Sequence, residues 1–544
     1  MTPATRLAPA VRVAGVTLGA LALVLAACSA PTEPTASTDT TSGPDGSGSS
    51  LVLADPYEDE ALNPLLGYGE GGASKIYEGL VGFDAQRRPR PLLAAELPTV
   101  SDDGLTWTAR LRSGVTFHDG STFDAEDVEA TYDALRDPSR AATVAGDYAM
   151  IEDVVATSGD TVEFRLKKPY APLLAKLTLG IVPSEALATE GTLDSSPLNS
   201  EPIGTGPYRL TEWRRGERME LKAYDDYWGT EPEIRNLSVV FVPDDNTRGQ
   251  RMSNGDFDGA PLPPALADTL GKRDGYTLYA HKSADQRNVM LPMKNPVTGD
   301  LAIRRALNHA VDREGMVRAV LSGHGTPASG PIPPVMKEYA DPEATFAFDP
   351  ARARRILDQA GWRPGKDGIR ERKGLEARFN LLYPATDSVR KALASAVASD
   401  ARKIGIDIRL EGLGWEAIQP RMSQDAVLMG GGTPLDPDLL LYGDLHSSLA
   451  EDGYNNPGSY ANAKVDVALD RARATTDPAS RQDAYREVQR ELVKDPARVY
   501  LVFLEHTYVS RTGWTGYEEV VDPHVHGALG WGPWWNVEKW RRAQ

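Results

Sequence analysis

The chain offers few residues whose types and spacing could carry out covalent chemistry. A hydrolase needs a nucleophile beside a base, or a metal held by paired histidines. The sequence contains neither G-x-S-x-G nor H-E-x-x-H, and its single cysteine is Cys28. Adjacent carboxylates such as Asp102-Asp103 and Asp225-Asp226 fall in turn-like or surface contexts, which are poor places to shift a pKa. The protein is therefore predicted not to be an enzyme, and a hydrolase is kept only as an alternative of another class.

Three glycines, Gly67, Gly69 and Gly72, have the spacing G-x-G-x-x-G of a dinucleotide-binding turn. That turn must follow a strand directly, so that the pyrophosphate reaches a helix N-terminus. Here Asn63-Pro64 separates the glycines from the nearby strand candidate at Leu51–Leu53. The glycines therefore do not predict a nucleotide site, and no cofactor is expected.

Two histidines near the end of the chain, His524 and His526, could present their imidazoles on one face of a strand. No third ligand is in view, so the pair predicts a weak or incidental metal site at most. The tryptophans that follow are expected to pack against the first domain: Trp531, Trp534, Trp535 and Trp540.

Cys28 follows Leu25-Ala26-Ala27 at the end of an apolar run that begins at Val13. The run is too short to span a bilayer as a permanent helix, and it follows a short positively charged start. Its end resembles a bacterial lipobox, in which the cysteine thiol takes a diacylglycerol. Residues 1–28 are thus predicted to be a lipoprotein signal peptide with Cys28 as the lipidation site. An ordinary secretory signal is the alternative.

Residues 29–50 consist mainly of Ser, Thr, Pro and Gly. Such a segment buries too little apolar surface to offset its ordering entropy, so it is predicted to be a flexible tether. No later stretch approaches 18 consecutive apolar residues. We expect the protein to meet the membrane only through its lipid anchor, on the outer face of the cytoplasmic membrane.

The composition limits the class of partner. The formal net charge is −18, and no block of Lys and Arg stands out, so nucleic acid is not an expected partner. The acidity mildly favours cationic ligands, although it also serves solubility. Residues 51–544 are too many for one hydrophobic core and predict two or three domains.

Strand and helix signals alternate along the chain, which predicts a multidomain α/β protein. Alternating apolar residues predict a hairpin over 105–117 with its turn at Ser113-Gly114, and a strand over 162–166. Asp124 is a predicted N-cap. Asp300 is predicted to cap one helix that runs to Gly323, and Asp349-Pro350 to open another. A helix from Val389 to Ile404, ended by Gly405, is followed by a strand over 406–410.

Several segments, in order, are similar to the peptide/nickel-binding family of ABC-importer solute-binding proteins. The N-terminal ones are Ile76-Tyr77-Glu78-Gly79-Leu80, Leu92-Leu93-Ala94-Ala95, Ser101–Trp107, Leu111–Gly120 and Ala125-Glu126-Asp127-Val128. The later ones are Gly204-Thr205-Gly206-Pro207-Tyr208, Tyr227-Trp228-Gly229, Arg304–Arg313 and Leu357–Trp362. The resemblance covers nearly all of residues 51–510 and is weaker over the last residues.

The resemblance implies an α/β class II periplasmic-binding-protein fold, with two lobes joined by a hinge and an extra inserted domain. Domain I would comprise 51–82, 200–283 and 505–544, domain II 83–199, and domain III 284–504. A di- or oligopeptide would be trapped where the lobes close, and the closed form would dock on the permease and ATPase subunits of an importer. A monomer is the family expectation. A receptor that senses peptides without importing them is the remaining alternative function.

The resemblance also implies a ligand loop at Gly430–Asp438. Dipeptide-binding relatives carry an aspartate in this loop that pairs with the peptide's ammonium group, and this chain has Thr433 there. Glu70 or Asp436 could substitute, because a buried ammonium needs a charged partner. Trp415 is a further candidate, although it also fits a core residue. The expected ligand-binding residues are Tyr68, Glu70, Trp415, Thr433, Leu435 and Asp436.

A nickel chelate or another small cation is the alternative ligand. The loop outline Gly432-x-Pro434-x-Asp436-Pro437 is similar to that of the nickel-binding branch of the family, whose ligating histidine lies farther along. His446 lies in that neighbourhood, though not at the matching spacing. The branch also uses an arginine in the segment that matches Leu173–Pro183, where this chain offers only Lys176.

Overall fold

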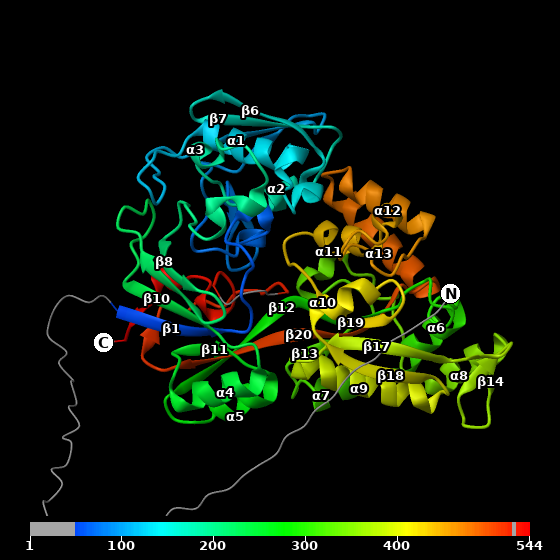
Figure 1. Ribbon diagram of the computed structural model, residues 1–544. Helices are drawn as coiled ribbons and strands as arrows, with labels where there is room; N and C mark the ends of the chain where they lie inside the picture. Colours follow the sequence, from blue (N-terminus) through cyan, green and yellow to red (C-terminus); the bar gives the residue numbers. More distant parts are fainter. Residues whose placement is uncertain (1–48, 525–528, 544) are drawn as a thin grey trace, which may run out of the picture. The chain divides into compact units, whose positions relative to one another are not determined.

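Residues 49–524 and 529–543 are described by the computed structural model, and within them eleven strands form one large sheet (Figure 1). The strand order is β18-β17-β19-β12-β20-β11-β1-β10-β9-β8, and β13 also pairs with β20. The strands are β1 (Ser49–Asp55), β8 (Tyr208–Arg214), β9 (Arg218–Ala223), β10 (Ile234–Phe241), β11 (Gly259–Pro261), β12 (Tyr276–Met290), β13 (Gly325–Pro327), β17 (Arg378–Pro384), β18 (Asp407–Leu413), β19 (Ala426–Gly431) and β20 (Arg498–Arg511).

The predicted signal peptide, including Cys28, lies outside the described residues, as does the predicted tether up to residue 48. Ser49 and Ser50, which were expected to end the tether, instead begin β1. Both residues pair with β10, and Ser49 Oγ donates a hydrogen bond to Glu233 O at 2.8 Å. Pairing with a neighbouring strand thus extends order into a segment whose composition alone favours a coil.

Two long antiparallel strands, β12 and β20, connect the two halves of the sheet (Figure 1). Their register shifts in the middle: Lys282 pairs with Glu505, and the next pair is Gln286 with Phe503. Three residues of β12 therefore oppose the single residue Leu504, which makes a β-bulge. A bulge bends its strand and re-aims side chains, so this position can act as a hinge between the two halves.

The hydrophobic core of the half of the sheet that contains β1 is built from residues near both ends of the described chain. Its core contains Leu51 and Leu53 from β1 together with Trp534 and Trp540, all four fully buried or nearly so. This confirms that these C-terminal tryptophans pack against the first part of the fold. Two helices, α4 (Asp245–Asn254) and α5 (Pro264–Gly271), lie beneath this half in Figure 1.

A smaller four-stranded sheet forms what we call the small-sheet body, at the top of Figure 1, with strand order β4-β5-β7-β6. It consists of β4 (Thr99–Val100), β5 (Thr106–Arg110), β6 (Ile151–Ser158), β7 (Thr161–Leu166), α1 (Ala125–Arg136), α2 (Leu173–Lys176) and α3 (Ser184–Leu187). The predicted cap at Asp124 is confirmed as a capping box with Asp127, and β7 confirms the predicted strand over 162–166.

The predicted hairpin over 105–117 is wrong. The strand β5 pairs with β4 and β7, and neither Val115 nor Phe117 belongs to a strand. Both side chains are fully buried in the same core as Trp107, so the apolar alternation continues across the turn although the backbone leaves the sheet. The apolar periodicity here indicates which side chains are buried, but it does not indicate which strands pair.

The other half of the sheet carries helices on both faces, with α7 and α9 beneath it in Figure 1. They are α6 (Leu301–Ala310), α7 (Arg313–Ala319), α8 (Pro350–Gln359), α9 (Ser388–Lys403), α10 (Trp415–Ile418), α11 (Pro437–Leu445), α12 (Ala463–Arg473) and α13 (Pro478–Lys494). The predicted helices that begin after Asp349 and near Val389 are confirmed, as is the strand that follows the second of them.

The single helix predicted from Asp300 to Gly323 is two helices. Asp300 caps α6 as expected, but Val311 is extended (φ −83°, ψ 129°) and ends it. Asp312 then starts α7 by accepting a hydrogen bond from Gly315 N at 2.8 Å, while its own N–H donates to Asp400 at 2.9 Å. A second N-cap inside a helical pattern therefore breaks the helix.

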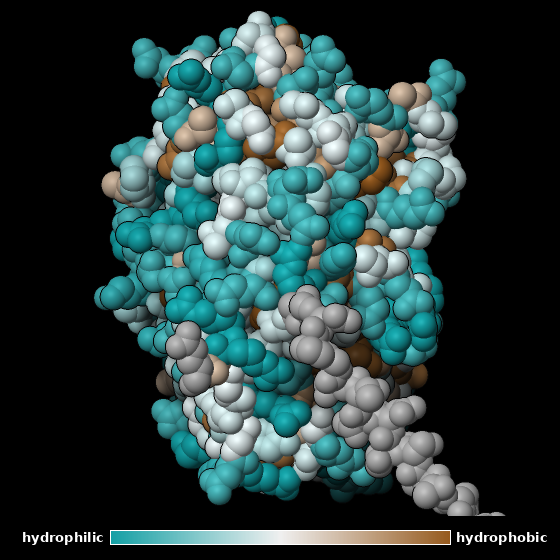
Figure 2. Space-filling view, turned by 90° about the vertical axis from the view of Figure 1, so that its left-hand side faces the viewer, coloured by the Kyte–Doolittle hydropathy of each residue, from teal (hydrophilic) through white to brown (hydrophobic). Residues whose placement is uncertain are grey.

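Short elements complete the described chain. The remaining strands are β2 (Val81–Phe83), β3 (Pro89–Pro91), β14 (Arg363–Pro364), β15 (Arg370–Arg372), β16 (Leu375–Glu376), β21 (Trp514–Thr515) and β22 (Arg541–Arg542). The 3-10 helices near the site are η1 (Pro64–Leu66) and η2 (Glu70–Gly72). Within the described residues, no helix has the length and apolarity to cross a bilayer. Figure 2 shows one side of the molecule, where hydrophilic residues predominate and apolar residues lie in small separate patches.

Three of the recognised sequence segments meet at one buried carboxyl, that of Glu78. Its oxygens accept hydrogen bonds from Trp228 Nε1 (2.7 Å), Tyr227 OH (2.8 Å) and Thr205 Oγ1 (3.0 Å). Burial raises the pKa of Glu78 to about 7, although these three donors act in the opposite direction. The segments around residues 78, 205 and 228 are thus joined by one polar cluster that fixes the return of the chain into the first half.

Candidate functional site

Charged side chains gather at the hinge bulge, where the two halves of the large sheet meet. Asp285, within the bulge, accepts hydrogen bonds from Arg287, from His506 Nε2 (2.9 Å) and from His524 Nδ1 (3.0 Å). Asp522, in the C-terminal segment, accepts from Tyr508 OH (2.7 Å) and Gly532 N (2.9 Å). Both carboxylates are almost completely buried, so the hinge contains a buried ionic network.

His506 links the two carboxylates of this network, since its Nδ1 lies 3.4 Å from Asp522 Oδ2. Burial alone would lower the pKa of His506, but hydrogen bonds to Asp285 and Asp522 raise it to about 9. For Asp285, burial alone would raise the pKa. The neighbouring Arg287, His524 and His506 outweigh this effect and hold the pKa of Asp285 well below its usual range. The hinge therefore contains a protonated histidine between two ionised carboxylates at neutral pH.

Two arginines of the β19 half lie next to this network. Arg287 is on β12 and Arg390 is in the first turn of α9, and both are more than nine-tenths buried. Arg390 Nη1 donates to Asp387 Oδ2 at 2.7 Å, and its guanidinium lies 5.9 Å from the ring of Trp415. Burial alone would lower the pKa of Arg390, but Asp387 and then Tyr57 raise it. Tyr57 follows β1, so residues of both halves act at this point.

The predicted ligand loop begins where β19 ends, beside these arginines. Gly432 has φ +144°, and a Cβ there would lie 2.0 Å from Ala284 O, so only glycine fits. Thr433 is half-buried, and its Oγ1 accepts from Leu435 N at 3.3 Å. A Cβ on Gly71 would lie 3.6 Å from Leu435 Cδ1, which shows that the loop touches the segment after β1.

Asp436 and His446, two of the predicted site residues, are engaged inside the protein. Asp436 is 7% exposed and forms two hydrogen bonds with Arg481, at 2.7 and 2.9 Å, while it also caps α11. The imidazole of His446 bonds Ser448 Oγ at 2.7 Å and stacks on Tyr442 at 4.4 Å. Among the described residues, no three His, Cys, Asp or Glu side chains are grouped so that they could hold a metal ion.

The other predicted site residues are accessible. Glu70 is exposed at the start of η2, and Tyr68 is half-buried, with its ring centre 6.2 Å from that of Tyr77 in an edge-to-face arrangement. Trp415 is half-buried, and its ring packs against Tyr454. Of the two C-terminal histidines, His524 sits in a bend instead of the predicted strand and bonds Asp285, and His526 lies outside the described residues.

The comparisons with known proteins agree with this arrangement. Residues 88–451 match the family described as bacterial extracellular solute-binding proteins, family 5. Protein XP55 of Streptomyces lividans is 45% identical over 507 residues, which cover 93% of this chain and 92% of that protein. The chain belongs to this family.

Solved members of the family show the same fold. The Campylobacter jejuni protein NikZ, in complex with Ni(L-His), superposes with a TM-score of 0.83 and is 29% identical, covering 91% of this chain and 99% of its own. The Bacillus subtilis oligopeptide-binding protein AppA, in complex with a nonapeptide, has a TM-score of 0.81 and is 25% identical, with the same coverage of this chain. The predicted class II periplasmic-binding-protein fold is confirmed. The halves with β1 and β19 are its first and second lobes, and the protein is a solute-binding protein of the ABC-importer type.

Sequence reasoning missed the charged residues of this family 5 protein that lie at the hinge: Asp285, Arg287, Arg390, His506 and Asp522. One signal was available. The run Asp285-Gln286-Arg287-Asn288 lies in the part of β12 from residue 283 to 290 in which every residue is buried, and charged residues in such a stretch need partners. The partners, however, come from distant parts of the chain, and no local pattern marks them.

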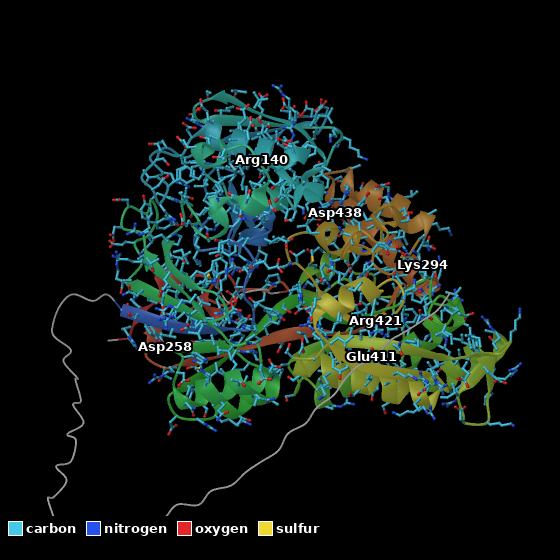
Figure 3. The ribbon with its side chains drawn as sticks, in the orientation of Figure 1. Arg140, Asp258, Lys294, Glu411, Arg421 and Asp438 are labelled. Atoms are coloured by element: carbon cyan, nitrogen blue, oxygen red, sulfur yellow. The ribbon has the colours of Figure 1, made fainter. Side chains whose placement is uncertain are left out.

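The small-sheet body touches the second lobe through polar contacts around Tyr170. Tyr170 OH donates to Asp438 Oδ2 at 3.1 Å, and Asp438 also accepts two hydrogen bonds from Arg473, at 3.0 and 2.8 Å. Asp438 is 1% exposed, and Figure 3 places it where α11 approaches the small-sheet body. Ala171 N adds a bond to Arg473 O at 2.9 Å. These contacts join the small-sheet body to the second lobe.

Replacing Tyr170 with phenylalanine is expected to favour the open form. The variant loses a hydrogen bond to a charged group, which contributes about 1.5–3 kcal/mol, and this bond joins the small-sheet body to the second lobe. Small-angle X-ray scattering should give a larger radius of gyration for Y170F without ligand. The control is Y148F, because Tyr148 OH bonds Lys176 O within the small-sheet body. Identical scattering from Y170F and the wild type would contradict the role given to this contact.

Proposed function

We propose that the protein captures di- or oligopeptides between its lobes and delivers them to the permease of an ABC importer. The observation that carries this proposal is the meeting of the two lobes at Arg390. It is a buried cation of the second lobe, and Tyr57 of the first lobe lies near enough to contribute, after Asp387, to raising its pKa. A peptide is long enough to touch both lobes at such a site, and a ligand with contacts on both lobes favours the closed form.

The first lobe offers a carboxyl group for the ammonium end of a peptide. Asp59 follows β1, is half-buried, and has no salt bridge among the described residues. Burial raises the pKa of Asp59 to about 7, and Asp55 and Glu58 add to the effect. A nearby ammonium would relieve this repulsion. Asp59, together with the exposed Glu70, can therefore replace the aspartate that the loop lacks at Thr433, whereas Asp436 is already paired with Arg481.

A nickel chelate is the second candidate ligand, because the NikZ structure contains Ni(L-His). Three observations favour a peptide as the ligand. AppA was solved with a nonapeptide, and a relative with 29% identity from Salmonella paratyphi A is named a glutathione-binding protein. In addition, His446 of this chain is engaged by Ser448 and Tyr442.

We also propose that the protein has three domains and a lipid anchor. Domain I would comprise 51–82, 200–283 and 505–544, domain II 83–199 and domain III 284–504. The separate apolar cores around Leu53, Phe164 and Leu381 support this division. The lipid on Cys28 would hold a monomer at the outer face of the cytoplasmic membrane, beside the permease and ATPase subunits.

Peptide binding should raise the thermal stability of the protein. A pool of di- to pentapeptides at 100 times the dissociation constant stabilises the folded state by about 2.7 kcal/mol. Differential scanning fluorimetry with this pool, and separately with nickel and L-histidine, measures the effect. A shift with the pool alone supports the peptide proposal. A shift with nickel and histidine alone would overturn it in favour of the chelate.

A further inference from the structure

We propose that Asp245 of the first lobe and Ser388 of the second lobe form a latch that favours the arrangement in which the two lobes are in contact. The latch joins the first turns of two helices, α4 and α9. Because the two residues are engaged with each other, the latch acts on the lobes and not on the solute. It would therefore raise the affinity for any solute held between the lobes, whether a peptide or a nickel chelate.

One carboxylate oxygen joins the two lobes at this point. Asp245 Oδ2 accepts a hydrogen bond from Ser388 Oγ at 2.5 Å and another from Ser388 N at 3.2 Å. Asp245 is the first residue of α4, which follows β10 of the first lobe, and Ser388 is the first residue of α9, which follows β17 of the second lobe. The two helices lie beneath different halves of the large sheet in Figure 1. A movement that parts these helices must break both hydrogen bonds.

Arg248 holds the carboxylate of Asp245 in position for this contact. Its Nη2 lies 2.6 Å from Asp245 Oδ1, and its side chain is 4% exposed. The same guanidinium donates to Val242 O at 2.7 Å and to Pro261 O at 2.8 Å. One carboxylate oxygen is thus fixed within the first lobe while the other faces the second lobe. A preorganised acceptor loses less conformational entropy when the lobes meet.

The first turn of α9 needs an acceptor of this kind. The first N–H groups of a helix have no carbonyl partner within the helix, and they form the positive end of its dipole. The N-cap Asp387 accepts from Arg390 N at 2.7 Å, so Ser388 N must be satisfied by another group. The carboxylate of Asp245 supplies the acceptor, and it lies at the N-terminal ends of two helices at once. This position favours a negative group.

The sharpest test replaces Ser388 with proline. Proline is favoured at the first position of a helix, and the second lobe already begins α8, α11 and α13 with this residue. Asp387 has an extended backbone (φ −92°, ψ 103°), which is compatible with a following proline. S388P therefore keeps α9 but removes both the N–H and the hydroxyl group that donate to Asp245.

S388P is expected to lower the ratio of closed to open protein by about 3- to 10-fold, the effect of losing a partly exposed hydrogen bond to a charged group. Small-angle X-ray scattering of the full-length protein without ligand should then give a larger radius of gyration. Isothermal titration with the di- to pentapeptide pool, and with nickel and L-histidine, should show binding weakened by up to the same factor. The melting temperature should stay close to that of the wild type, because proline at a compatible position restricts the unfolded chain.

Two further variants locate the effect. L301P places proline at the first position of α6, where the cap Asp300 bonds Ala302 N and does not need Leu301 N. This variant should leave the scattering and the binding unchanged. D245A removes the latch from the other lobe and should open the protein as S388P does. The double variant should open it no further than either single variant, because both changes remove the same contact.

The outcomes separate the latch from the choice of ligand. A larger radius of gyration in S388P and D245A, with L301P unchanged, supports the latch. Equal radii in the wild type and S388P overturn it, as does opening in S388P without opening in D245A. A larger radius in L301P as well would also overturn it, since proline itself would then account for the change. Failure of both probes to bind the wild type overturns the peptide proposal alone, because the scattering without ligand decides on the latch.

Discussion

Replacing Asp436 with alanine should lower the free energy of unfolding by about 3–5 kcal/mol, because removing one partner of a buried ion pair leaves the other charge uncompensated. The side chains of Asp436 and Arg481 are both about nine-tenths buried and share two hydrogen bonds. The variant also removes the N-cap of α11, since Asp436 accepts from Asp438 N at 2.8 Å. Urea unfolding of the wild type and D436A, followed by circular dichroism, measures the difference.

A matched control is D483A on the same helix as Arg481. Asp483 is 78% exposed and lies 3.8 Å from Arg486, so its removal should change stability by less than about 1 kcal/mol. The sequence predicted Asp436 to be a ligand-binding residue, whereas the structure gives it a role in stability. The two roles predict different results for D436A. A D436A protein with unchanged stability and lost ligand binding would show that the carboxylate serves the solute instead of the fold.

Stability should fall as the pH rises from 6.5 to about 9, because in that range the unfolded chain has released the proton of His506 while the fold still holds it. The pKa of His506 is raised from 6.5 in the unfolded chain to about 9 in the fold, so the fold binds the proton more tightly. The resulting stabilisation is complete below pH 6.5 and is lost through pH 9. It amounts to roughly 3 kcal/mol for a shift of this size.

Unfolding free energies measured across this range should therefore slope downward for the wild type and much less for H506Q. Glu78, with a pKa raised to about 7, adds a similar fall that starts at its unfolded value of 4.5 and ends near the lower part of this range. The control is H118Q, because burial lowers the pKa of His118 to about 4 and it does not titrate above pH 6.5. An equal slope in H506Q and the wild type would show that the hinge histidine is not charged.

The features that sequence predicted well are local. Asp124, Asp300 and Asp349 each cap the helix that follows them, because a cap depends on a side chain and the backbone two or three residues ahead. The break between α6 and α7 at Val311 is also set locally, by the N-cap Asp312. The sequence shows this aspartate, but the continuous apolar periodicity of the two helices suggested a single helix. The failed hairpin over 105–117 shows the opposite limit, since the partner strand β7 begins only at Thr161.

The candidate site was much harder to predict. Its loop was found from a resemblance, and Leu435 does touch the segment after β1. However, the engagement of Asp436 depends on Arg481, and the network at Asp285 on His506 and His524, all far away in sequence. Whether a carboxylate faces a ligand or a guanidinium is decided by tertiary packing, which a single sequence does not reveal.

The closure of the first core by Trp534 and Trp540 also sets an order of events during synthesis. Leu51 and Leu53 are made long before the two tryptophans that share their core. The first lobe therefore cannot complete its packing until Trp534 and Trp540 have been made, whereas the small-sheet body finds all of its strands within Thr99–Leu166. Until then the leading end of the chain stays loosely packed.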